Sequence, residues 1–411
     1  MKILHTSDWH LGRRLYDFDR YDAFEQFLSW LLSMIETEKI DALVVAGDIF
    51  DTCVPTHRSQ AMYYDFLARL GKTCCRHAVI VGGNHDSPTQ LNAPQNILSH
   101  LGIYVVGGAE SDPAREIVEL RDEEGKLEGV VCAIPYLRER DILRIKADSQ
   151  LSRDEEIVAA TKDHYETVVK KAVETIGSSR VPLIATGHLM TANSKVGHDE
   201  NALYIGSLGI VPSSVFPSVI SYLALGHIHK AQLIGGDRTR NYSGAPIPFN
   251  FDEASHAKIV RVVEFDKEKV KAVSDLPVPS FDRIVTVRGK LSDIEIQLDQ
   301  IKVLSEQNPS QPVLAQIIHE DTSSATNLVE TVQRLIAGTS IQVVRVEDTA
   351  RRFASLAEGE NVLTIEQLDP MSVFDKRLEQ EEVEEEMREK LVAIYRSVVD
   401  MAQMGQSFAT P

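Results

Sequence analysis

The chain has 411 residues, of which 43% are hydrophobic and 25% are charged, a composition typical of a soluble globular protein with two or three domains. Its formal net charge of −18 argues against a protein that holds nucleic acid through its own overall field, so a nuclease would need local positive charge from bound metals or a partner. No apolar run approaches the roughly 18 residues that span a bilayer, and the N-terminus turns polar too early for a signal peptide. The four cysteines, of which Cys74 and Cys75 are adjacent, have no Cys-x-x-Cys spacing and are interpreted as reduced thiols, so we expect a cytoplasmic protein with no membrane partner.

Short apolar runs alternate with amphipathic stretches from residue 1 to about 275, which predicts strands with covering helices and a first domain over 1–275. The apolar residues of 21–35 share one broad face, which predicts a helix. The predicted strands are short and almost uniformly apolar, so we expect the centre of a sheet that is covered on both faces. These strands are residues 3–5, 42–46, 78–81, 183–185 and 222–225.

A second unit begins where the composition changes near residues 277–279, and we place it at 276–350. Its pattern predicts a small α+β domain without a chemical motif, whose role is structural or substrate-guiding. The expected order is a strand at 283–288, a helix at 293–304, a strand at 313–319, a helix at 325–336 and a strand at 341–346.

The last segment, 351–411, contains two stretches with helical spacing of apolar residues on either side of a Glu-rich run. Met371, Phe374 and Leu378 form the first stripe, and Leu391, Ile394, Tyr395, Val398 and Met401 form the second. An appendage of this size has little core of its own. It either packs back on the main body or docks on a partner, and the pattern alone leaves both interpretations open.

Five segments share one design: an apolar run, then a small residue or tight turn, then polar residues suited to metal ligation. Ligand sites in open α/β sheets collect at the carboxyl ends of strands, where these polar sets fall. Asp8 and His10 are two residues apart, as are His227 and His229, and in an extended segment this spacing points both side chains the same way. The segments are Ser7-Asp8-Trp9-His10, Gly47-Asp48-Ile49-Phe50-Asp51, Gly83-Asn84-His85-Asp86, Gly187-His188 and Gly226-His227-Ile228-His229.

The segments offer seven candidate ligands with carboxylate, imidazole and amide groups, a mixture that suits manganese, iron or zinc. Seven groups are too many for one ion with an open position, so we expect two divalent ions about 3.5–4 Å apart. Asp48 follows a central strand and is expected to bridge them. Asp8, His10 and His229 are assigned to one ion, and Asn84, His188 and His227 to the other.

The ordered set Asp-x-His, Gly-Asp-x-x-Asp, Gly-Asn-His-Asp, Gly-His and Gly-His-x-His resembles the calcineurin-like metallophosphoesterases. The flanking residues are similar to those of the SbcD nuclease family within them, at KILHTSDWHLG (2–12), VVAGDIFDT (44–52), YIGSL (204–208), ALGHIH (224–229) and SGAPIP (243–248). The resemblance is strong through about residue 255 and looser beyond. It implies an α/β fold in which helices flank a β-sandwich, followed by a small α+β capping domain and a C-terminal helical appendage.

The same resemblance implies a manganese-dependent DNA nuclease with 3′-to-5′ exonuclease activity on duplex ends and an endonuclease activity that includes hairpin cleavage. Such nucleases act in DNA repair, recombination and replication, as a homodimer bound to the ATPase SbcC in a heterotetramer. Their C-terminal helices dock at the base of the SbcC coiled coil, which favours the partner-docking interpretation of 351–411.

Direct hydrolysis of a phosphodiester needs no covalent enzyme intermediate, and no Ser or Cys stands in a suitable motif. His85 follows the ligand Asn84 directly, so its side chain is expected to point elsewhere, to remain unligated and to act as the general acid. Asp51 is expected to orient His85, as a carboxylate fixes the tautomer of an imidazole. Archaeal and eukaryotic relatives often carry a His in place of Asp51, so no role of that His is transferred to this chain.

Three other functions compete with the nuclease. A protein phosphatase of the superfamily typically follows Gly-Asp-x-x-Asp with Arg-Gly, whereas this chain has Thr52-Cys53. A small-molecule or cyclic-nucleotide phosphodiesterase would have no use for the extra domain and the amphipathic tail, and a non-catalytic scaffold would not need the complete ligand set.

The other histidines are expected to pack or lie at the surface, with His198 a candidate for a loop near the substrate: His5, His57, His77, His100, His164, His198 and His256.

Overall fold

A computed structural model describes residues 1–143, 151–191, 210–307, 311–321 and 328–349, together with Arg388, Leu391, Val392 and Tyr395. The chain divides into two compact units, and the first, Met1–Ile318 with Asn327–Glu347, contains almost all of the described elements. His198, the motif at 204–208 and nearly all of the predicted segment 351–411 lie outside the described residues.

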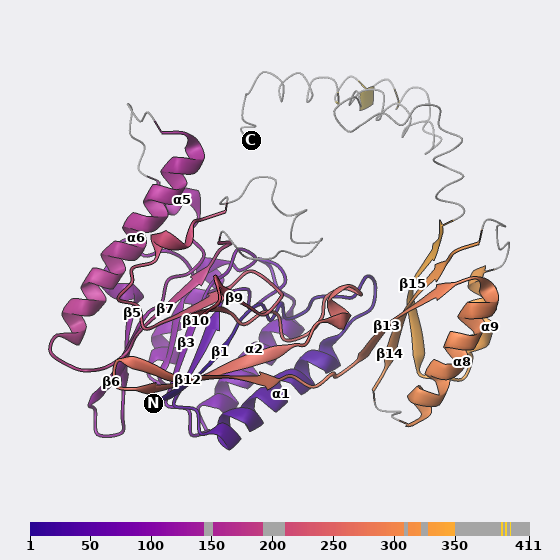
Figure 1. Cartoon of the computed structure of the whole chain (residues 1–411), viewed down its shortest axis with the longest axis horizontal. Helices are drawn as coiled ribbons and strands as arrows, with labels where there is room; N and C mark the ends of the chain where they lie inside the picture. The colour runs from indigo at the N-terminus through magenta and orange to yellow at the C-terminus, as the bar shows by residue number, and fades with distance from the viewer. Residues whose placement is uncertain are drawn as a thin grey trace. The chain divides into compact units, whose positions relative to one another are not determined.

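Two six-stranded sheets form the largest part of the strand framework over residues 1–277 (Figure 1). In the first sheet, β1 to β4 run parallel, whereas β11 is antiparallel to β1 and β12 is antiparallel to β11. Its order is β12-β11-β1-β2-β3-β4, formed by Lys269–Pro277, Ile259–Asp266, Lys2–Thr6, Ala42–Ala46, His77–Val81 and Ile103–Val106. In the second sheet, β6, β7, β8 and β10 run parallel. Its order is β5-β6-β7-β8-β10-β9, formed by Ile117–Arg121, Leu127–Cys132, Leu183–His188, Tyr222–Gly226, Asp237–Tyr242 and Gln232–Ile234.

Alternation along each strand sends its two faces into different hydrophobic cores. In β2, Ala42 and Val44 lie in the core between the two sheets, and Leu43 and Val45 lie in the core that also contains α1 (Tyr21–Glu38) and α2 (His57–Leu70). The second sheet shares another core with α6 (Arg153–Ile176). The result is a β-sandwich flanked by helices, so the expected α/β fold is confirmed. Every residue of β2 is buried, as its uniformly apolar run predicts.

Local sequence explains where the long helices begin and end. α1 ends at Glu38, and the next residue, Lys39, is left-handed with φ 55° and caps the last turn through its N–H. α2 begins after Thr56, whose side chain accepts the N–H of Ser59. α6 begins with a capping box formed by Ser152 and Glu155. The shorter helices are α3 (Pro88–Asn92), α4 (Gln95–Ser99) and α5 (Glu139–Ile142), with 3₁₀ turns η1 (Pro113–Glu116), η2 (Ser213–Val215) and η3 (Glu253–Ser255).

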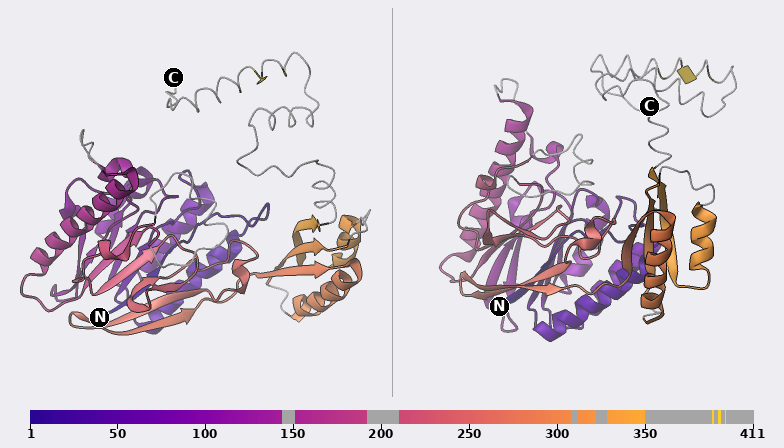
Figure 2. Two further views of the ribbon diagram at one scale, coloured as in Figure 1. Left: turned by 45° about the horizontal axis from the view of Figure 1, so that its top comes forward. Right: turned by 45° about the vertical axis from the view of Figure 1, so that its right-hand side comes forward.

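A three-stranded sheet with two helices follows the sandwich in the chain (orange in Figure 2). The strand order is β13-β14-β15. The predicted elements over 283–346 are present, with coincident ends for the strand at 313–319 and ends shifted by a few residues for the others, and 325–327 lie outside the described part. Among the described helices, none combines the length and apolar character that a bilayer span requires. The elements are β13 (Arg283–Gly289), α8 (Leu291–Gln307), β14 (Val313–His319), α9 (Leu328–Ile336) and β15 (Ile341–Asp348).

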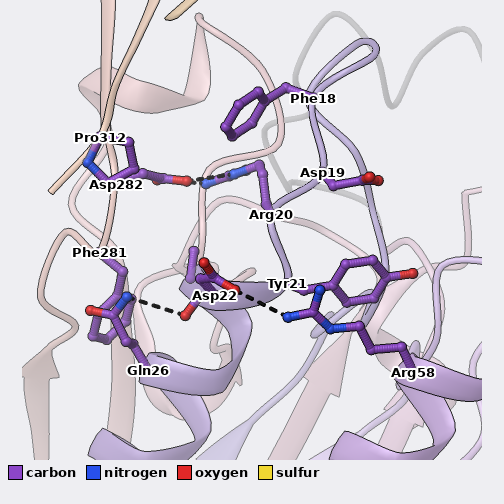
Figure 3. Close-up of a pocket in the computed structure, with 11 residues that line it drawn as sticks. Phe18, Asp19, Arg20, Tyr21, Asp22, Gln26, Arg58, Phe281, Asp282 and Pro312 are labelled. Carbon is purple, nitrogen blue, oxygen red and sulfur yellow. Dashed lines mark hydrogen bonds and ion pairs between the residues drawn. The ribbon is translucent and has the colours of Figure 1, made fainter. Parts of the chain in front are cut away.

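A buried ion pair fastens the start of α1 to the segment that leads into β13. Arg20 donates from Nε and Nη2 to the two carboxylate oxygens of Asp282, at 2.7 and 2.8 Å (Figure 3). It also donates to the carbonyl of Pro248. The side chains of Arg20 and Asp282 are 1% and 4% exposed. The pair borders a cavity of about 280 Å³ that is lined in part by Phe18 and Phe281 and by none of the predicted ligands.

Candidate metal centre

Backbone hydrogen bonds hold together the loops that carry the predicted ligands. The N–H groups of Asp8 and His10 donate to the carbonyls of Gly47 and Asp48, at 3.0 Å in both cases. The Asp8 carboxylate accepts the backbone N–H of His227 at 2.8 Å. These bonds join the loops after β1, β2 and β8 across both sheets, at the carboxyl ends of the strands, where ligand sites are expected.

The first group of predicted ligands is compact. Asp8, His10 and His229 each offer a ligand atom, and these atoms lie within 4.8 Å of one another. The rings of His10 and His229 are 5.1 Å apart between centroids. Asp8 also forms a trio of the same size with Asp48 and His188, so both groups belong to one cluster.

Asp48 lies between the two groups. Its Oδ2 is 3.4 Å from His10 Nε2 and 3.2 Å from His188 Nε2. Asn84 Oδ1 is 3.0 Å from His188 Nε2 and 3.0 Å from His227 Nδ1. All seven predicted ligand side chains are therefore neighbours in space; their division between two ions stays a prediction.

Four of the seven candidates have a backbone conformation that non-glycine residues rarely adopt. The φ angle is 53° at Asp8, 46° at His10, 51° at Asp48 and 95° at His227. Such strain persists where the surrounding structure enforces it, and it clusters at functional sites. The expectation that Asp8 and His10 share an extended segment is wrong, because both are left-handed. Their side chains converge because the two loops pair through their backbones.

Two motif glycines are required because the loops approach one another closely. A Cβ at Gly83 would lie 2.0 Å from Asp48 Oδ1, and one at Gly226 would lie 1.9 Å from the carbonyl oxygen of Ala46. No side chain fits at either position without moving the backbone. The glycines of Gly-Asn-His-Asp and Gly-His-x-His thus permit the contacts that bring the ligands together.

His85 lies beside the cluster, with its ring 4.8 Å from that of His10 and its backbone N–H bonded to Asp48 Oδ1 at 2.9 Å. Its Nδ1 is 2.7 Å from the backbone carbonyl of Asp51. A carbonyl only accepts, so Nδ1 carries the proton and Nε2 is left for other partners. Asp51 thus contacts His85 as expected, but through its backbone carbonyl, whereas its carboxylate pairs with His10 Nδ1 at 3.5 Å and with Arg13 at 3.0 Å. Ligand atoms of His10, Asp51 and His85 also lie within 4.8 Å of one another, so geometry alone permits His85 to ligate.

Burial and charge suit the cluster to cations. Both ring nitrogens of His10 are buried without a hydrogen bond, and burial lowers the pKa of His10 to about 4 and that of His227 to about 3. Both rings are neutral near pH 7, as metal ligands must be. Although burial opposes it, attraction to Asp48 raises the pKa of His188 to about 9. The same attraction holds the pKa of Asp48 well below its usual range despite burial, so the centre already favours positive charge beside an ionised carboxylate.

Two carboxylates to which the sequence motifs assigned no role support the cluster. Asp86 is buried and accepts three backbone N–H groups, at 2.8, 3.0 and 3.1 Å, from the loops after β2 and β3. Burial, with repulsion from Asp48, raises the pKa of Asp86 to about 6. Glu253 contacts Nδ1 of His229 at 3.2 Å. The position of Asp86 inside Gly-Asn-His-Asp could have suggested its role, whereas no motif surrounds Glu253.

Two other histidines have partners away from the cluster. His5 is buried and bonds to the hydroxyl of Tyr222 at 3.0 Å. His164 pairs with the buried Glu116 at 2.8 Å. Packing accounts for both residues, as expected from the sequence.

Comparison with known proteins agrees with the architecture and with the motifs. Residues 1–231 match the family described as calcineurin-like phosphoesterase. Residues 280–382 match the family described as type 5 capsule protein repressor C-terminal domain, SbcD_C.

The chain is similar along most of its length to curated relatives named as the SbcD component of the nuclease SbcCD. The Escherichia coli K12 protein is 34% identical over 400 residues, covering 97% of this chain and 98% of the relative. The Rhodobacter capsulatus protein is 30% identical over 83% of this chain and 87% of its own. The Bacillus subtilis protein is 32% identical over 64% of this chain and 66% of its own. The chain therefore belongs to the calcineurin-like phosphoesterases and, within them, to the SbcD family of metal-dependent nuclease subunits.

Proposed function

We propose that this chain is a manganese-dependent DNA nuclease subunit that removes nucleotides from duplex ends in the 3′-to-5′ direction and also cuts endonucleolytically, including at hairpins. It acts in the cytoplasm in DNA repair, recombination and replication. The observation that carries the proposal is that seven candidate ligand side chains, from the ends of five strands, lie together with Asp48 between the other six. The names of the relatives add the assignment to a nuclease complex.

In the proposed arrangement, Asp8, His10 and His229 hold one ion, Asn84, His188 and His227 hold the other, and Asp48 contacts both. The mixed oxygen and nitrogen donors favour Mn²⁺ over a soft metal. When bound, the ions supply Lewis acidity and neutralise charge that develops on the phosphate. They also provide the local positive charge that a protein with a net charge of −18 needs at a DNA backbone.

His85 is the proposed general acid. Its Nδ1–H donates to the carbonyl of Asp51 at 2.7 Å, so Nε2 is the end left to face the substrate. The proposed acid is the doubly protonated ring, whose second proton, on Nε2, passes to the leaving oxygen or is donated to the phosphate. Asp51 acts through its backbone on His85 and through its carboxylate on His10 and Arg13.

We further propose three functional parts: the nuclease domain at 1–275, a capping domain at 276–350 and a partner-binding helical segment at 351–411. The chain assembles as a homodimer within a heterotetramer, and the C-terminal helices bind an SbcC-type ATPase. The name SbcCD of the relatives' complex supports such a partner. Apolar stripes on either side of a Glu-rich run in 371–401 support helical docking.

A substrate panel tests the nuclease assignment. The purified chain is incubated with Mn²⁺ and hairpin DNA, a phosphopeptide, or bis-p-nitrophenyl phosphate, with and without an SbcC-type ATPase and ATP. Cleavage of the DNA is expected. Cleavage of the small ester alone, even with the ATPase present, would favour a small-molecule phosphodiesterase instead.

A truncation tests the docking of the partner. Deleting residues after about 365 should abolish co-purification with the ATPase while hydrolysis of the small ester continues. Unchanged co-purification would contradict docking through the C-terminal segment. Loss of ester hydrolysis would instead mean that this segment supports the nuclease domain.

A further inference from the structure

A glutamate that is not a predicted ligand contacts Nδ1 of His229, which is one. Glu253 is the first residue of η3, and its Oε1 lies 3.2 Å from Nδ1 of His229. Its Oε2 accepts Nζ of Lys258 at 2.6 Å. The side chains of Glu253 and Lys258 are only 13% and 8% exposed, so solvent contributes little to their interaction.

The orientation of this carboxylate is fixed from several directions. Oε2 accepts the backbone N–H of Phe249 at 3.4 Å in addition to Lys258. Oε1 accepts Nδ2 of Asn250 at 3.3 Å and faces His229. An ionised carboxylate only accepts hydrogen bonds, so Nδ1 of His229 must carry the proton. The lone pair of His229 therefore resides on Nε2.

The two groups of predicted ligands differ in the partner of the histidine ring nitrogen Nδ1. In the group of Asp8, His10 and His229 (the Asp8 group), Nδ1 of His229 faces Glu253, and Nδ1 of His10 faces the Asp51 carboxylate at 3.5 Å. In the other group, Nδ1 of His188 lies 2.9 Å from the carbonyl of Ala46. A carboxylate behind an imidazole increases the basicity of the coordinating nitrogen and fixes the ring, so its loss weakens the ion held by that ring.

We propose that Glu253 is a positioning residue that fixes the tautomer of His229 and thereby sets the affinity of the ion in the Asp8 group. This inference rests on the proposed two-metal centre. It predicts unequal effects on the two ions, because among the contacts of the described residues Glu253 pairs with His229 and not with His188 or His227.

The substitution Glu253→Gln is a sharp test because most of the neighbouring donors favour one orientation of its amide. Oε2 accepts two donors, Nζ of Lys258 at 2.6 Å and the N–H of Phe249, whereas Oε1 accepts only the longer bond from Nδ2 of Asn250 at 3.3 Å, so the amide oxygen takes the Oε2 position. The amide NH₂ then faces Nδ1 of His229, which must accept, and the ring proton moves to Nε2. A protonated Nε2 cannot bind a metal.

The experiment measures binding of Mn²⁺ alone, by calorimetry and by electron paramagnetic resonance, to the full-length wild type, E253Q and E116Q. Glu116 is a matched control because it is also buried and paired with a histidine, His164, at 2.8 Å. In E253Q the affinity for one of the two ions should fall about 10- to 100-fold while the other is retained. E116Q should bind both ions as the wild type does. The double variant E253Q/K258M frees the amide to turn its oxygen to His229, so it should recover part of the lost affinity.

Wild-type affinity for both ions in E253Q would overturn the proposal. Equal weakening of both ions, or the same loss in E116Q, would assign Glu253 a general structural role and would also overturn it. No recovery in E253Q/K258M would contradict the tautomer step. Failure of the wild type itself to bind two ions would instead refute the two-metal function.

Discussion

Nε2 of His188 lies 3.2 Å from Oδ2 of Asp48, so the nitrogen that is predicted to bind a metal also pairs with a carboxylate. This pairing raises the pKa of His188 to about 9 against the effect of burial. A cation entering the centre must displace the proton on Nε2. Binding of metal and binding of hydrogen ions are therefore linked at this residue.

Metal loading should release about one proton from His188 at pH 7. Because the raised pKa keeps the ring protonated below about pH 9, the apparent Mn²⁺ affinity should rise as pH rises toward that value and level off above it. His10 and His227 contribute no proton near pH 7, since burial keeps them neutral. Calorimetry in buffers of different ionisation enthalpy counts the protons. Affinity that is constant from pH 6 to pH 9 would refute the linkage.

Replacing Asp48 should remove both ions, because its carboxylate stands between the two ligand groups. Metal analysis of purified Asp48→Ala after loading with Mn²⁺ is expected to find neither ion bound. The exposed Asp17 offers a control, Asp17→Ala, that should keep both. One tightly bound ion in Asp48→Ala would show that Asp48 does not bridge the two ions.

Replacing His85 should separate catalysis from metal binding. Without a general acid, His85→Ala should lower turnover about 10²- to 10⁴-fold while keeping both ions. Metal content and nuclease rate are measured on the same preparation, with the exposed His100→Ala as the control. Near-normal turnover would remove His85 from the mechanism, and loss of an ion would make it a ligand.

The substitution Asp51→Asn separates the role of the backbone carbonyl of Asp51 from the role of its carboxylate. The backbone carbonyl that fixes His85 is retained, so turnover at saturating Mn²⁺ should stay near that of the wild type. Loss of the carboxylate behind His10 should weaken Mn²⁺ binding by about tenfold or more. A fall in turnover to the level of His85→Ala would restore a direct role for the carboxylate.

The Arg20–Asp282 pair should contribute strongly to stability because both partners are buried. Arg20→Met leaves the Asp282 carboxylate buried without its cation, which is expected to cost about 3–5 kcal/mol of unfolding free energy. Replacing both residues with apolar ones should restore part of it. Urea unfolding of the metal-free variants measures these differences, and a cost under about 1 kcal/mol for Arg20→Met would contradict the expectation.

Strands buried on both faces could be predicted from the sequence almost residue by residue. β2 and β14 coincide with their predicted ranges, because short runs of mostly apolar residues have few environments available other than a buried strand. β12 was not predicted, since most of its residues are exposed and lack a regular apolar pattern. Its neighbour β11 pairs with β1 in the register Ile3↔Val263. No local pattern identifies a partner so distant in the chain.

In the candidate site, the identities of the candidate ligands could be predicted from the sequence, whereas the contacts of their atoms could not. Motifs located all seven ligand candidates, because their residue types and strand-end positions are visible in the sequence. The atoms that orient His85 and His229 were not predictable. They depend on the path of the loops through left-handed residues such as Asp8 and Asp48 and on Glu253, which reaches the centre from a distant turn.

The left-handed conformations of Asp8, His10, Asp48 and His227 also bear on how the protein tolerates mutation. Glycine adopts such conformations without steric cost, so a glycine at any of these positions would relieve strain while deleting a ligand. Inactive variants of this kind could therefore resist denaturation better than the active protein in the absence of metal. Selection for thermal stability alone would favour folded variants without activity. Only selection for activity keeps these four positions occupied by their present residues.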